Sequence, residues 1–480
     1  MASSDPLAPI EPLVREVPYR DPLAAFTVFA GEPNGLFLDS ALVVEPLGRY
    51  SFIAVDPFQV LSAKGQEVRL DGRPVAGDPF AVLARELARY PLSSRPDLPP
   101  FQSGVAGYFG YELARHLEAV PLAPLDDMGF PDLALGFYDV VAFDQRERKA
   151  WILSSGYPES EAQDRRSRAE ARAEAMAARL ATAPVEPPPL PESRSPVAVT
   201  SNFTRPGYEA AVARVIDYIY AGDIFQANLT QRFRAELPAG LTPFTLYRRL
   251  RQLNPAPFAA YLDFGQVVIA SSSPERFLSV RNGRVETRPI KGTRPRGRSP
   301  AEDQALMRAL LASEKDRAEN VMIVDLLRND LSRVCRDTSV AVPELCICET
   351  FATVFHLVST IVGELEPGRS ALDLLKASFP GGSITGAPKI RAMEIIAALE
   401  PTQRGPYCGT IGYIGFDGTM DSNIVIRTYA LNGSTVTFQA GGGIVADSDP
   451  AEEYEESLAK ARALIDALSD QAKLDDSGHR

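Results

Sequence analysis

Residues 258–288 read Phe-Ala-Ala-Tyr-Leu-Asp-Phe-Gly-Gln-Val-Val-Ile-Ala-Ser-Ser-Ser-Pro-Glu-Arg-Phe-Leu-Ser-Val-Arg-Asn-Gly-Arg-Val-Glu-Thr-Arg. Runs of β-branched and aromatic residues alternate there with short turn sequences, which predicts a meander of four strands. Residues 407–445 show a similar pattern, in which Asn432-Gly433 is typical of a hairpin turn. Consecutive strands joined by short turns predict antiparallel sheets with helices packed outside, which is an α+β fold.

Prolines mark the clearest change of composition, at residues 184, 187–189 and 191. They predict an extended connector between two regions. We divide the chain into a strand-rich N-terminal region (1–183), the connector (184–200), a region of strands and helices (201–470) and a polar tail (471–480). Helices are predicted at residues 79–90, 112–119, 159–183, 242–253, 302–331, 371–378, 387–399 and 451–468, and Thr204 begins another.

The composition is that of an ordinary globular protein, with 45% hydrophobic and 23% charged residues in 480. A net charge of -12 argues against nucleic acid and anionic membranes as partners. No apolar stretch is long enough to span a bilayer and the first residues lack a secretion signal, so we expect a cytoplasmic protein. The cysteines, Cys335, Cys346, Cys348 and Cys408, lack metal-finger spacing and are expected to be reduced thiols.

Lys291 is the leading candidate for a nucleophile. It lies in Arg288-Pro-Ile-Lys-Gly-Thr-Arg-Pro-Arg296, where three arginines would depress the pKa of a neighbouring ammonium group. A lysine that loses its proton near neutral pH can act as a nucleophile. The alternative is a solvated basic loop.

Three further residues each have two interpretations. Glu275 forms a capping box with the serine three positions earlier, or serves as a general acid. Arg427 ends an apolar strand and needs a carboxylate partner, from the protein or from a ligand. His356 lies in an apolar strand, where a histidine is more often structural.

Acidic and glycine-rich segments offer candidate ligand contacts. Glu453 and Glu456 share one helix face and could bridge a divalent cation with Glu319, or could only satisfy a helix dipole. The segment 379–389, Phe-Pro-Gly-Gly-Ser-Ile-Thr-Gly-Ala-Pro-Lys, predicts a tight turn or an anion cradle before a helix whose first turn holds Pro388. The glycine run Gly441-Gly442-Gly443 permits a close approach of the backbone to a ligand.

Taken together, these segments resemble the chorismate-utilising enzymes, which include anthranilate, aminodeoxychorismate, isochorismate and salicylate synthases. The resemblance extends over most of the chain and implies two large antiparallel sheets in a sandwich-like core. The matching segments are residues 222–232 (Gly-Asp-Ile-Phe-Gln-Ala-Asn-Leu-Thr-Gln-Arg), 273–277 (Ser-Pro-Glu-Arg-Phe), 289–293 (Pro-Ile-Lys-Gly-Thr), 319–330, 379–394, 421–428 and 439–460.

The residues at two positions distinguish the reactions that members of this family catalyse. Where anthranilate synthases usually have alanine and aminodeoxychorismate synthases usually have lysine, this chain has Lys291. Where isochorismate-forming enzymes have a water-activating lysine, it has Gln226, which argues against water as the nucleophile. The resemblance thus implies amination of chorismate at C4 to 4-amino-4-deoxychorismate, for p-aminobenzoate and folate synthesis. Lys291 would attack C2 while Glu275 protonates the departing C4 hydroxyl, and ammonia would then displace the lysine.

The resemblance also implies a full set of binding residues. Magnesium would be held by Glu319 and Glu456, with Glu453 in support, and would bind the ring carboxylate. Arg427, Tyr407 and the amides of Gly441, Gly442 and Gly443 would receive the enolpyruvyl carboxylate. Gly292, Thr293 and Ser383 would line the pocket, and His356 would lie near the ring. A possible tryptophan pocket would involve Ser40, Pro257, Phe258 and Ala259, without feedback inhibition.

Partners and competing functions follow from the same resemblance. No cysteine lies in a Gly-x-Cys-x-Gly nucleophile turn, so ammonia from glutamine would require a separate amidotransferase subunit. The first alternative is an anthranilate synthase component I, which aminates C2 and eliminates pyruvate. A second alternative is a catalytically silent sensor of chorismate or of an amino acid.

Overall fold

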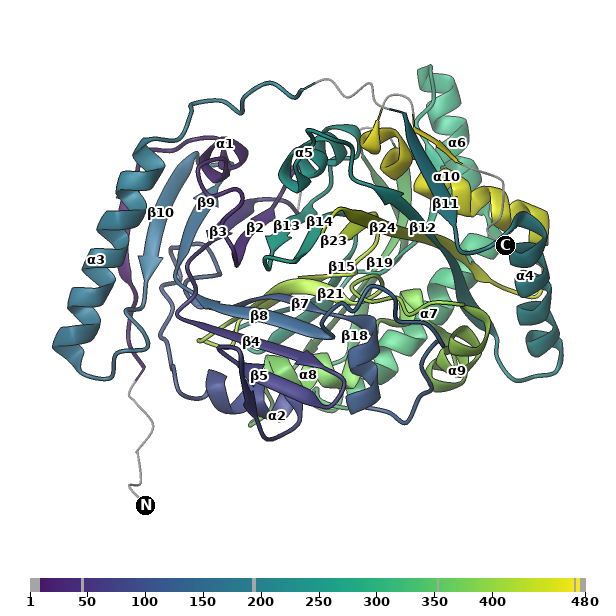
Figure 1. Ribbon diagram of the computed structural model, residues 1–480. Helices are drawn as coiled ribbons and strands as arrows, with labels where there is room; N and C mark the ends of the chain where they lie inside the picture. The colour runs from purple at the N-terminus through teal and green to yellow at the C-terminus, as the bar shows by residue number, and fades with distance from the viewer. Residues whose placement is uncertain (1–8, 45–46, 192–195, 352–353, 470–471, 475–480) are drawn as a thin grey trace.

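The computed structural model describes residues 9–44, 47–191, 196–351, 354–469 and 472–474. Within these residues the chain forms two large, mainly antiparallel sheets, with helices packed on their outer sides (Figure 1). The predicted α+β fold with a sandwich-like core is confirmed. None of the helices in this part of the chain is long and apolar enough to cross a membrane.

The first sheet combines strands from both regions of the chain. All its pairings are antiparallel except that of β11 with β25, and β20 (Gly386–Ala387) pairs with β12 off the main path. In order across the sheet the strands are β1 (Leu13–Val17), β10 (Lys149–Ser154), β9 (Val140–Asp144), β3 (Tyr50–Ala54), β2 (Gly35–Asp39), β13 (Phe258–Asp263), β14 (Val267–Ser273), β23 (Thr428–Asn432), β24 (Thr435–Ile444), β12 (Gln226–Glu236), β11 (Val197–Ser201) and β25 (Ala472–Leu474).

The second sheet also joins the two regions, through the pairing of β7 with β21. In order its strands are β17 (Ile290–Pro295), β19 (Val354–Glu364), β16 (Arg284–Thr287), β15 (Arg276–Arg281), β22 (Met420–Asn423), β21 (Thr410–Gly415), β7 (Gly104–Phe109), β8 (Leu133–Tyr138), β4 (Gln59–Lys64), β5 (Glu67–Leu70) and β6 (Arg73–Val75), while β18 (Ala341–Thr350) pairs with β19. Both regions therefore share both sheets, and the boundaries drawn from the proline connector stay a prediction.

Helices occupy the predicted stretches, and two short ones, at residues 22–26 and 382–384, were not predicted. The stretch 302–331 holds two helices, because Ser313 has an extended backbone and its hydroxyl accepts the Asp316 N–H to cap the second helix. The helices are α1 (Pro22–Phe26), α2 (Pro79–Leu87), η1 (Tyr111–His116), α3 (Ala162–Ala181), α4 (Arg205–Tyr220), α5 (Pro243–Leu253), α6 (Pro300–Ala312), α7 (Glu314–Ser332), α8 (Ala371–Ser378), η2 (Gly382–Ile384), α9 (Lys389–Leu399) and α10 (Pro450–Leu468). Pro388 is the N-cap of α9 and lies outside its first turn.

Apolar side chains fill three layers. One cluster lies between the sheets and includes Phe52, Tyr108 and Ile269. A second cluster packs α2, α7 and α8 on the outer side of the second sheet, and a third packs α3, α5 and α10 on the first. Burial of these surfaces is the main favourable term for such a core.

The antiparallel strands predicted at residues 407–445 are present, and β23 and β24 form the predicted hairpin. The meander predicted at residues 258–288 is wrong in topology. β13 and β14 form a hairpin in the first sheet, whereas β15 and β16 form one in the second. The chain crosses between sheets at Pro274–Glu275, and it crosses again between β22 and β23 at residues 424–427. The crossings matter because both candidate residues Glu275 and Arg427 lie in them.

The connector and the tail fall partly outside the described residues. Residues 184–191 form no helix or strand, and β11 begins at Val197, inside the predicted connector. Of the predicted tail at 471–480, only Ala472–Leu474 are described, and they form β25. The rest of the predicted polar tail lies outside the described residues.

Candidate active site

A cavity of about 650 Å³ lies among β12, β17, β24, α7, α10 and η2. It is lined by every residue that the sequence assigned to catalysis, substrate or metal. These are Lys291 and Glu275; Gly292, Thr293, His356, Ser383, Tyr407, Arg427, Gly441, Gly442 and Gly443; and Glu319, Glu453 and Glu456. The structure thus brings the whole set together, while the role of each residue stays a prediction.

The two crossings between sheets hold Glu275 and Arg427 in fixed positions. The Ile424 N–H donates to the Glu275 carbonyl at 3.0 Å, and the Ser273 hydroxyl donates to the Ile424 carbonyl at 2.6 Å. Glu275 is therefore part of a buried crossing and does not belong to a helix, so the capping-box interpretation is wrong. Its N–H instead donates to the Ser273 hydroxyl at 3.3 Å.

Lys291 extends into the cavity from a bulge in β17. The pairing with β19 shifts register between Lys291 and Thr293, and Gly292 has φ +77, a left-handed conformation that favours glycine. The Lys291 Nζ donates to the Ser383 carbonyl at 3.1 Å. Burial lowers the pKa of Lys291 below its ordinary value, against the opposing attraction of Glu319 and Glu275.

The predicted low pKa of Lys291 thus has a different cause from the one expected. Each neighbouring arginine is bound to a carboxylate, which offsets its positive charge. The cation that does repel Lys291 is Lys460, on α10. The arginine pairs are Arg288 with Glu349, Arg294 with Asp316 and Arg296 with Asp303.

Glu275 has the properties of an acid that is protonated near neutral pH. Its side chain is buried, with 5% of the residue exposed, and burial raises its pKa to about 7. The Lys291 ammonium, the Ser383 hydroxyl and the Ile290 N–H act in the opposite direction. Glu275 and Lys291 therefore meet around Ser383, one as a candidate proton donor and the other as a candidate amine.

The acidic side of the cavity is formed by Glu319 of α7 and by Glu453 and Glu456 of α10. Burial raises the pKa of Glu319 and of Glu453, and the charge of Glu456 raises both further. Partial burial would raise the pKa of Glu456, but Lys460 at 2.6 Å lowers it below its ordinary value. Glycine at 442 permits this grouping, because a Cβ there would stand 2.7 Å from Glu453 Oε2.

These carboxylates fit a magnesium ion with few protein ligands. Among the described residues, no three acidic, histidine or cysteine side chains converge closely enough to form a metal site alone. Magnesium commonly takes one or two carboxylates and completes its shell with water and substrate. A cation at Glu319 and Glu456 would also relieve the repulsion that raises the pKa of Glu319, so the predicted ion is compatible with the donors.

Arg427 forms no ion pair with a carboxylate of the described residues, although the charge of Glu456 acts on it from a distance. Its Nη1 donates to the Lys460 carbonyl at 3.2 Å, and burial lowers its pKa. Of the two interpretations of Arg427, the structure therefore favours a partner that comes from a ligand. Tyr407 lies in the same wall, and burial raises the pKa of its hydroxyl.

His356 faces Thr293 across β19 and β17. The Thr293 Oγ1 lies 2.9 Å from the His356 Nδ1. Burial and the charge of Arg427 lower the pKa of His356 to about 4, so its ring is neutral at physiological pH. A neutral, hydrogen-bonded imidazole in the wall suits contact with a ligand better than proton transfer.

The segment 379–389 offers a carbonyl oxygen to the cavity. The N–H groups of Ile384 and Thr385 bond to carbonyls within the turn. The Ser383 carbonyl accepts from both Lys291 Nζ and Asn228 Nδ2. At Ser383 the structure thus favours the tight-turn interpretation over the anion cradle.

Several cavity residues were missed by sequence reasoning. Lys460 could have been found, because it lies four residues after Glu456 on one helix face. Asn228 also carried a signal, since it lies two residues after Gln226 and shares its strand face. Lys315 and Gln439 carried no such signal, because long-range packing brings them to the cavity. All four of these residues line the cavity, whereas Gln226 is fully buried and does not.

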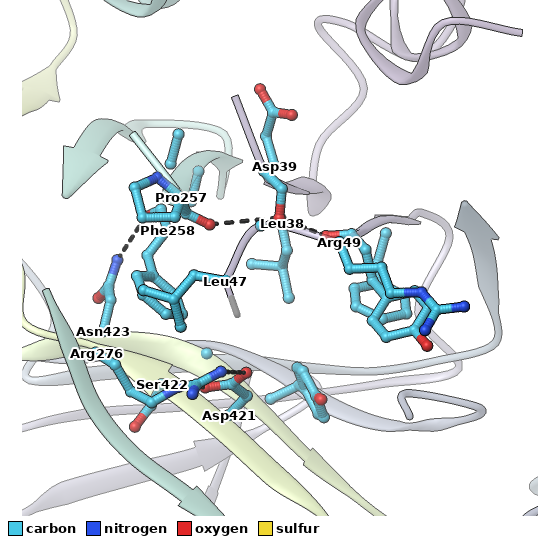
Figure 2. Close-up of a pocket in the computed structure, with 18 of the residues that line it drawn as sticks. Leu38, Asp39, Leu47, Arg49, Pro257, Phe258, Arg276, Asp421, Ser422 and Asn423 are labelled. Atoms are coloured by element: carbon cyan, nitrogen blue, oxygen red, sulfur yellow. Dashed lines mark hydrogen bonds and ion pairs between the residues drawn. The ribbon is translucent and has the colours of Figure 1, made fainter. Parts of the chain in front are cut away.

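A second cavity, of about 260 Å³, is lined by residues of β2, β13 and β22, among others (Figure 2). All four residues predicted for a tryptophan pocket line it, namely Ser40, Pro257, Phe258 and Ala259. Asn423 Nδ2 donates to the Phe258 carbonyl at 3.0 Å, and Arg276 pairs with Asp421. Asp39 points away from the cavity in Figure 2 and binds Arg251 and Tyr247. Tryptophan binding here stays a prediction.

Comparisons with known proteins agree with this geometry. An anthranilate synthase component 1 of Thermus thermophilus is 41% identical over 93% of this chain and 95% of its own length. An aminodeoxychorismate synthase component 1 of Salmonella typhimurium is 40% identical over 96% and 99%. The crystal structure of anthranilate synthase component I from Streptococcus pneumoniae superposes with a TM-score of 0.76 at 35% identity, covering 88% of this chain and 93% of that one. The family model described as chorismate binding enzyme matches residues 39–466, and the chain therefore belongs to that family.

Proposed function

We propose that this enzyme is an aminodeoxychorismate synthase component I, which replaces the C4 hydroxyl of chorismate with an amino group. The relatives described above carry two names at nearly equal identity, so overall similarity does not choose between C4 and C2 amination. The observation that favours C4 amination is Lys291, an amine of lowered pKa. Its Nζ donates to the Ser383 carbonyl, and the Ser383 side chain bonds to the protonatable Glu275. Amination at C2 by direct attack of ammonia would need no such amine.

The proposed reaction has two displacements. In the first, the neutral amine of Lys291 forms a bond to C2 of chorismate, the ring double bond shifts, and the C4–O bond breaks. The proton of Glu275 goes to the departing hydroxyl, which leaves as water. In the second, ammonia forms a bond to C4 and the C2–N bond to Lys291 breaks. The proton that ammonia loses returns to Glu275, so the sum is chorismate plus ammonia to 4-amino-4-deoxychorismate plus water.

The charges of the cavity support this assignment. Chorismate carries two carboxylates, and Arg427 with Tyr407 offers one of them a partly buried cationic site. Magnesium held by Glu319 and Glu456 would supply positive charge for the other carboxylate, against five acidic side chains in the wall. Without a cation there, the acidic side of the cavity would repel the substrate.

A separate amidotransferase subunit is the proposed source of ammonia. Burial raises the pKa of Cys408 to about 12, and the thiol lines this cavity rather than a glutaminase site. Burial also raises the pKa of Cys335 and of Cys348. Such thiols are poor nucleophiles, because the thiolate is the reactive form.

Product identity tests the proposal directly. The purified chain is incubated with chorismate, magnesium and ammonium, and the product is identified by liquid chromatography and mass spectrometry. We expect 4-amino-4-deoxychorismate. Fluorescent anthranilate formed without an added lyase would instead establish the C2 alternative, and binding of chorismate without turnover would establish the sensor.

The covalent step has its own measurement. Rapid quench of a turnover, followed by peptide mass analysis, should detect a chorismate-derived mass on the peptide that contains Lys291. Lys291→Ala should lose both the adduct and the C4 product, while Lys389→Ala, which removes a lysine bound to Asp330 away from the cavity, should retain the adduct. Normal C4 amination by Lys291→Ala would contradict the mechanism.

A further inference from the structure

We propose that the buried ion pair of Arg404 and Glu400 positions the reacting groups of the main cavity. Neither side chain lines the cavity itself, so the pair acts through the residues that it holds. The inference rests on the proposed function, because it takes Lys291 and Glu275 as the groups that react. It deepens that function by naming residues that direct those groups without touching the substrate.

The pair is almost completely shielded from solvent. Arg404 is 2% exposed and Glu400 is 3% exposed. The guanidinium binds both carboxylate oxygens, at 2.7 Å through Nη2 and at 2.9 Å through Nε. Burying two charges is costly, and an apolar pair of similar volume is often equally stable or more stable. Stability alone therefore does not explain charges at this place, and we look to the groups that the charges hold.

The other hydrogen bonds of the two side chains go to the wall of the cavity. Arg404 Nη1 donates to the Ile384 carbonyl at 3.0 Å, and Nη2 donates to the Asn228 carbonyl at 2.9 Å. Glu400 Oε1 accepts the Thr230 N–H at 3.0 Å and the Thr230 hydroxyl at 2.9 Å. All three bound residues line the cavity. Because a guanidinium is planar and rigid, it fixes the positions of η2 and β12 relative to each other.

One of these contacts adjoins Ser383, to which both reacting groups are bound. Ile384 directly follows Ser383 in η2. The Ser383 carbonyl accepts from Lys291 Nζ at 3.1 Å, and the Ser383 hydroxyl bonds to Glu275. A neutral amine that donates one N–H to this carbonyl has its lone pair held in a defined direction. A shift of the Ile384 carbonyl would therefore move the amine and the acid together.

The backbone at Arg404 is held separately from its side chain. Glu112 of η1 accepts the Arg404 N–H at 2.8 Å and the Gly405 N–H at 2.9 Å. The Gln439 side chain donates to the Arg404 carbonyl at 2.8 Å. Since these bonds involve only the backbone of Arg404, they remain when its side chain is replaced. A substitution there should accordingly release the cavity wall without releasing the chain itself.

Kinetics of a variant without the two charges test the positioning role. Arg404→Met combined with Glu400→Leu removes both charges together, so that neither is left buried without its partner. We expect kcat for C4 amination to fall by about tenfold to a hundredfold, since a misplacement of about 1 Å can cost about 10²-fold in rate. The rate of Lys291 adduct formation without ammonia should fall by the same factor. The KM for chorismate should stay within about threefold of wild type, because Arg427 keeps its place.

Arg232→Met combined with Asp127→Leu is the matched control. Arg232 is 8% exposed, binds both carboxylate oxygens of Asp127 at 2.8 Å, and lies on the same strand β12. This pair also joins the N-terminal region to the first sheet, but it lines neither cavity. Its removal should leave kcat, the adduct rate and the chorismate KM unchanged.

A conservative variant covers the case in which the double variant does not fold. Arg404→Lys keeps a positive charge beside Glu400, but one ammonium group cannot reproduce the four directed hydrogen bonds of the guanidinium. It should show the same fall in kcat and in adduct rate, with the chorismate KM preserved. Thermal unfolding followed by circular dichroism establishes that each variant is folded.

The possible results separate the explanations. A folded variant with the kcat and adduct rate of wild type would overturn the positioning role. A chorismate KM that rises in parallel with the fall in kcat would indicate general distortion and would overturn it too, as would an equal loss of kcat in the control. These results would leave the proposed function intact, because the wild type would still form the C4 product. A wild type that forms no Lys291 adduct would overturn the proposed mechanism, and this inference with it.

Discussion

Replacement of Glu275 by glutamine separates the catalytic role of this residue from its effect on stability. Glutamine keeps the size of the side chain and can still accept hydrogen bonds, but it cannot deliver an acidic proton. A positioned general acid contributes roughly 10²–10⁴-fold to a rate, so kcat of Glu275→Gln should fall by about that factor. The KM for chorismate should change little, because the side chain keeps its shape.

The same substitution should stabilise the protein at alkaline pH. Burial raises the pKa of Glu275 from 4.5 to about 7 in the folded protein, whereas the unfolded chain keeps the ordinary value. A raised carboxyl pKa leaves stability intact below pH 4.5 and lowers it progressively as pH rises to about 7. At about 1.4 kcal/mol per unit, the ionised carboxylate costs on the order of 3 kcal/mol above pH 7.

Chemical denaturation at pH 4.5 and pH 8 measures this difference. Glu275→Gln should match the wild type at pH 4.5 and exceed its unfolding free energy at pH 8 by up to about 3 kcal/mol. Glu170→Gln, at an exposed site on α3, is the control and should differ at neither pH. A stability difference that is independent of pH, or turnover at the wild-type rate, would refute the assignment of Glu275 as a buried acid.

Three other residues give predictions about binding. Arg427→Gln should raise the KM for chorismate about tenfold to a hundredfold in steady-state assays, because a charged hydrogen bond contributes roughly 1.5–3 kcal/mol; an unchanged KM would contradict a carboxylate site there. Glu319→Gln should raise the magnesium concentration needed for half-maximal activity, and a chelator should abolish turnover reversibly; activity in chelator would exclude the metal. Millimolar tryptophan should not inhibit turnover, because Asp39 already binds Arg251 and Tyr247 and offers no carboxylate to an added ammonium group; inhibition would show that another group receives it.

Local sequence signals predicted secondary structure well and topology poorly. Thr204 and Thr242 accept backbone N–H groups as helix caps, since capping depends only on adjacent residues. Strand alternation located β13 to β16, but it does not say which sheet a strand joins. Pro274 and Glu275 look like an ordinary turn in sequence, and only the long-range pairing of β14 with β23 and of β15 with β22 makes them a crossing.

The candidate site shows the same limit in its electrostatics. The sequence placed Lys291 among arginines, which are its neighbours along the chain. In the structure those arginines point to carboxylates, and the groups that act on Lys291 come from α7, α10 and the crossing at Glu275. A pKa depends on distance in space and on burial, and neither follows from the spacing of charges in sequence.

The two crossings explain why distant motifs act as one site. The Ser272 N–H donates to the Arg427 carbonyl, and the Ile424 N–H donates to the Glu275 carbonyl, so each crossing supports the backbone of the other. Arg276 follows Glu275 directly and lines the second cavity, whereas Glu275 itself faces the first. A change that displaces either crossing must therefore move the candidate acid and the candidate carboxylate receptor together. Substitutions in the wall of the second cavity that disturb the Arg276–Asp421 pair should accordingly alter kcat and the chorismate KM jointly, although none of these side chains lines the cavity that holds Lys291.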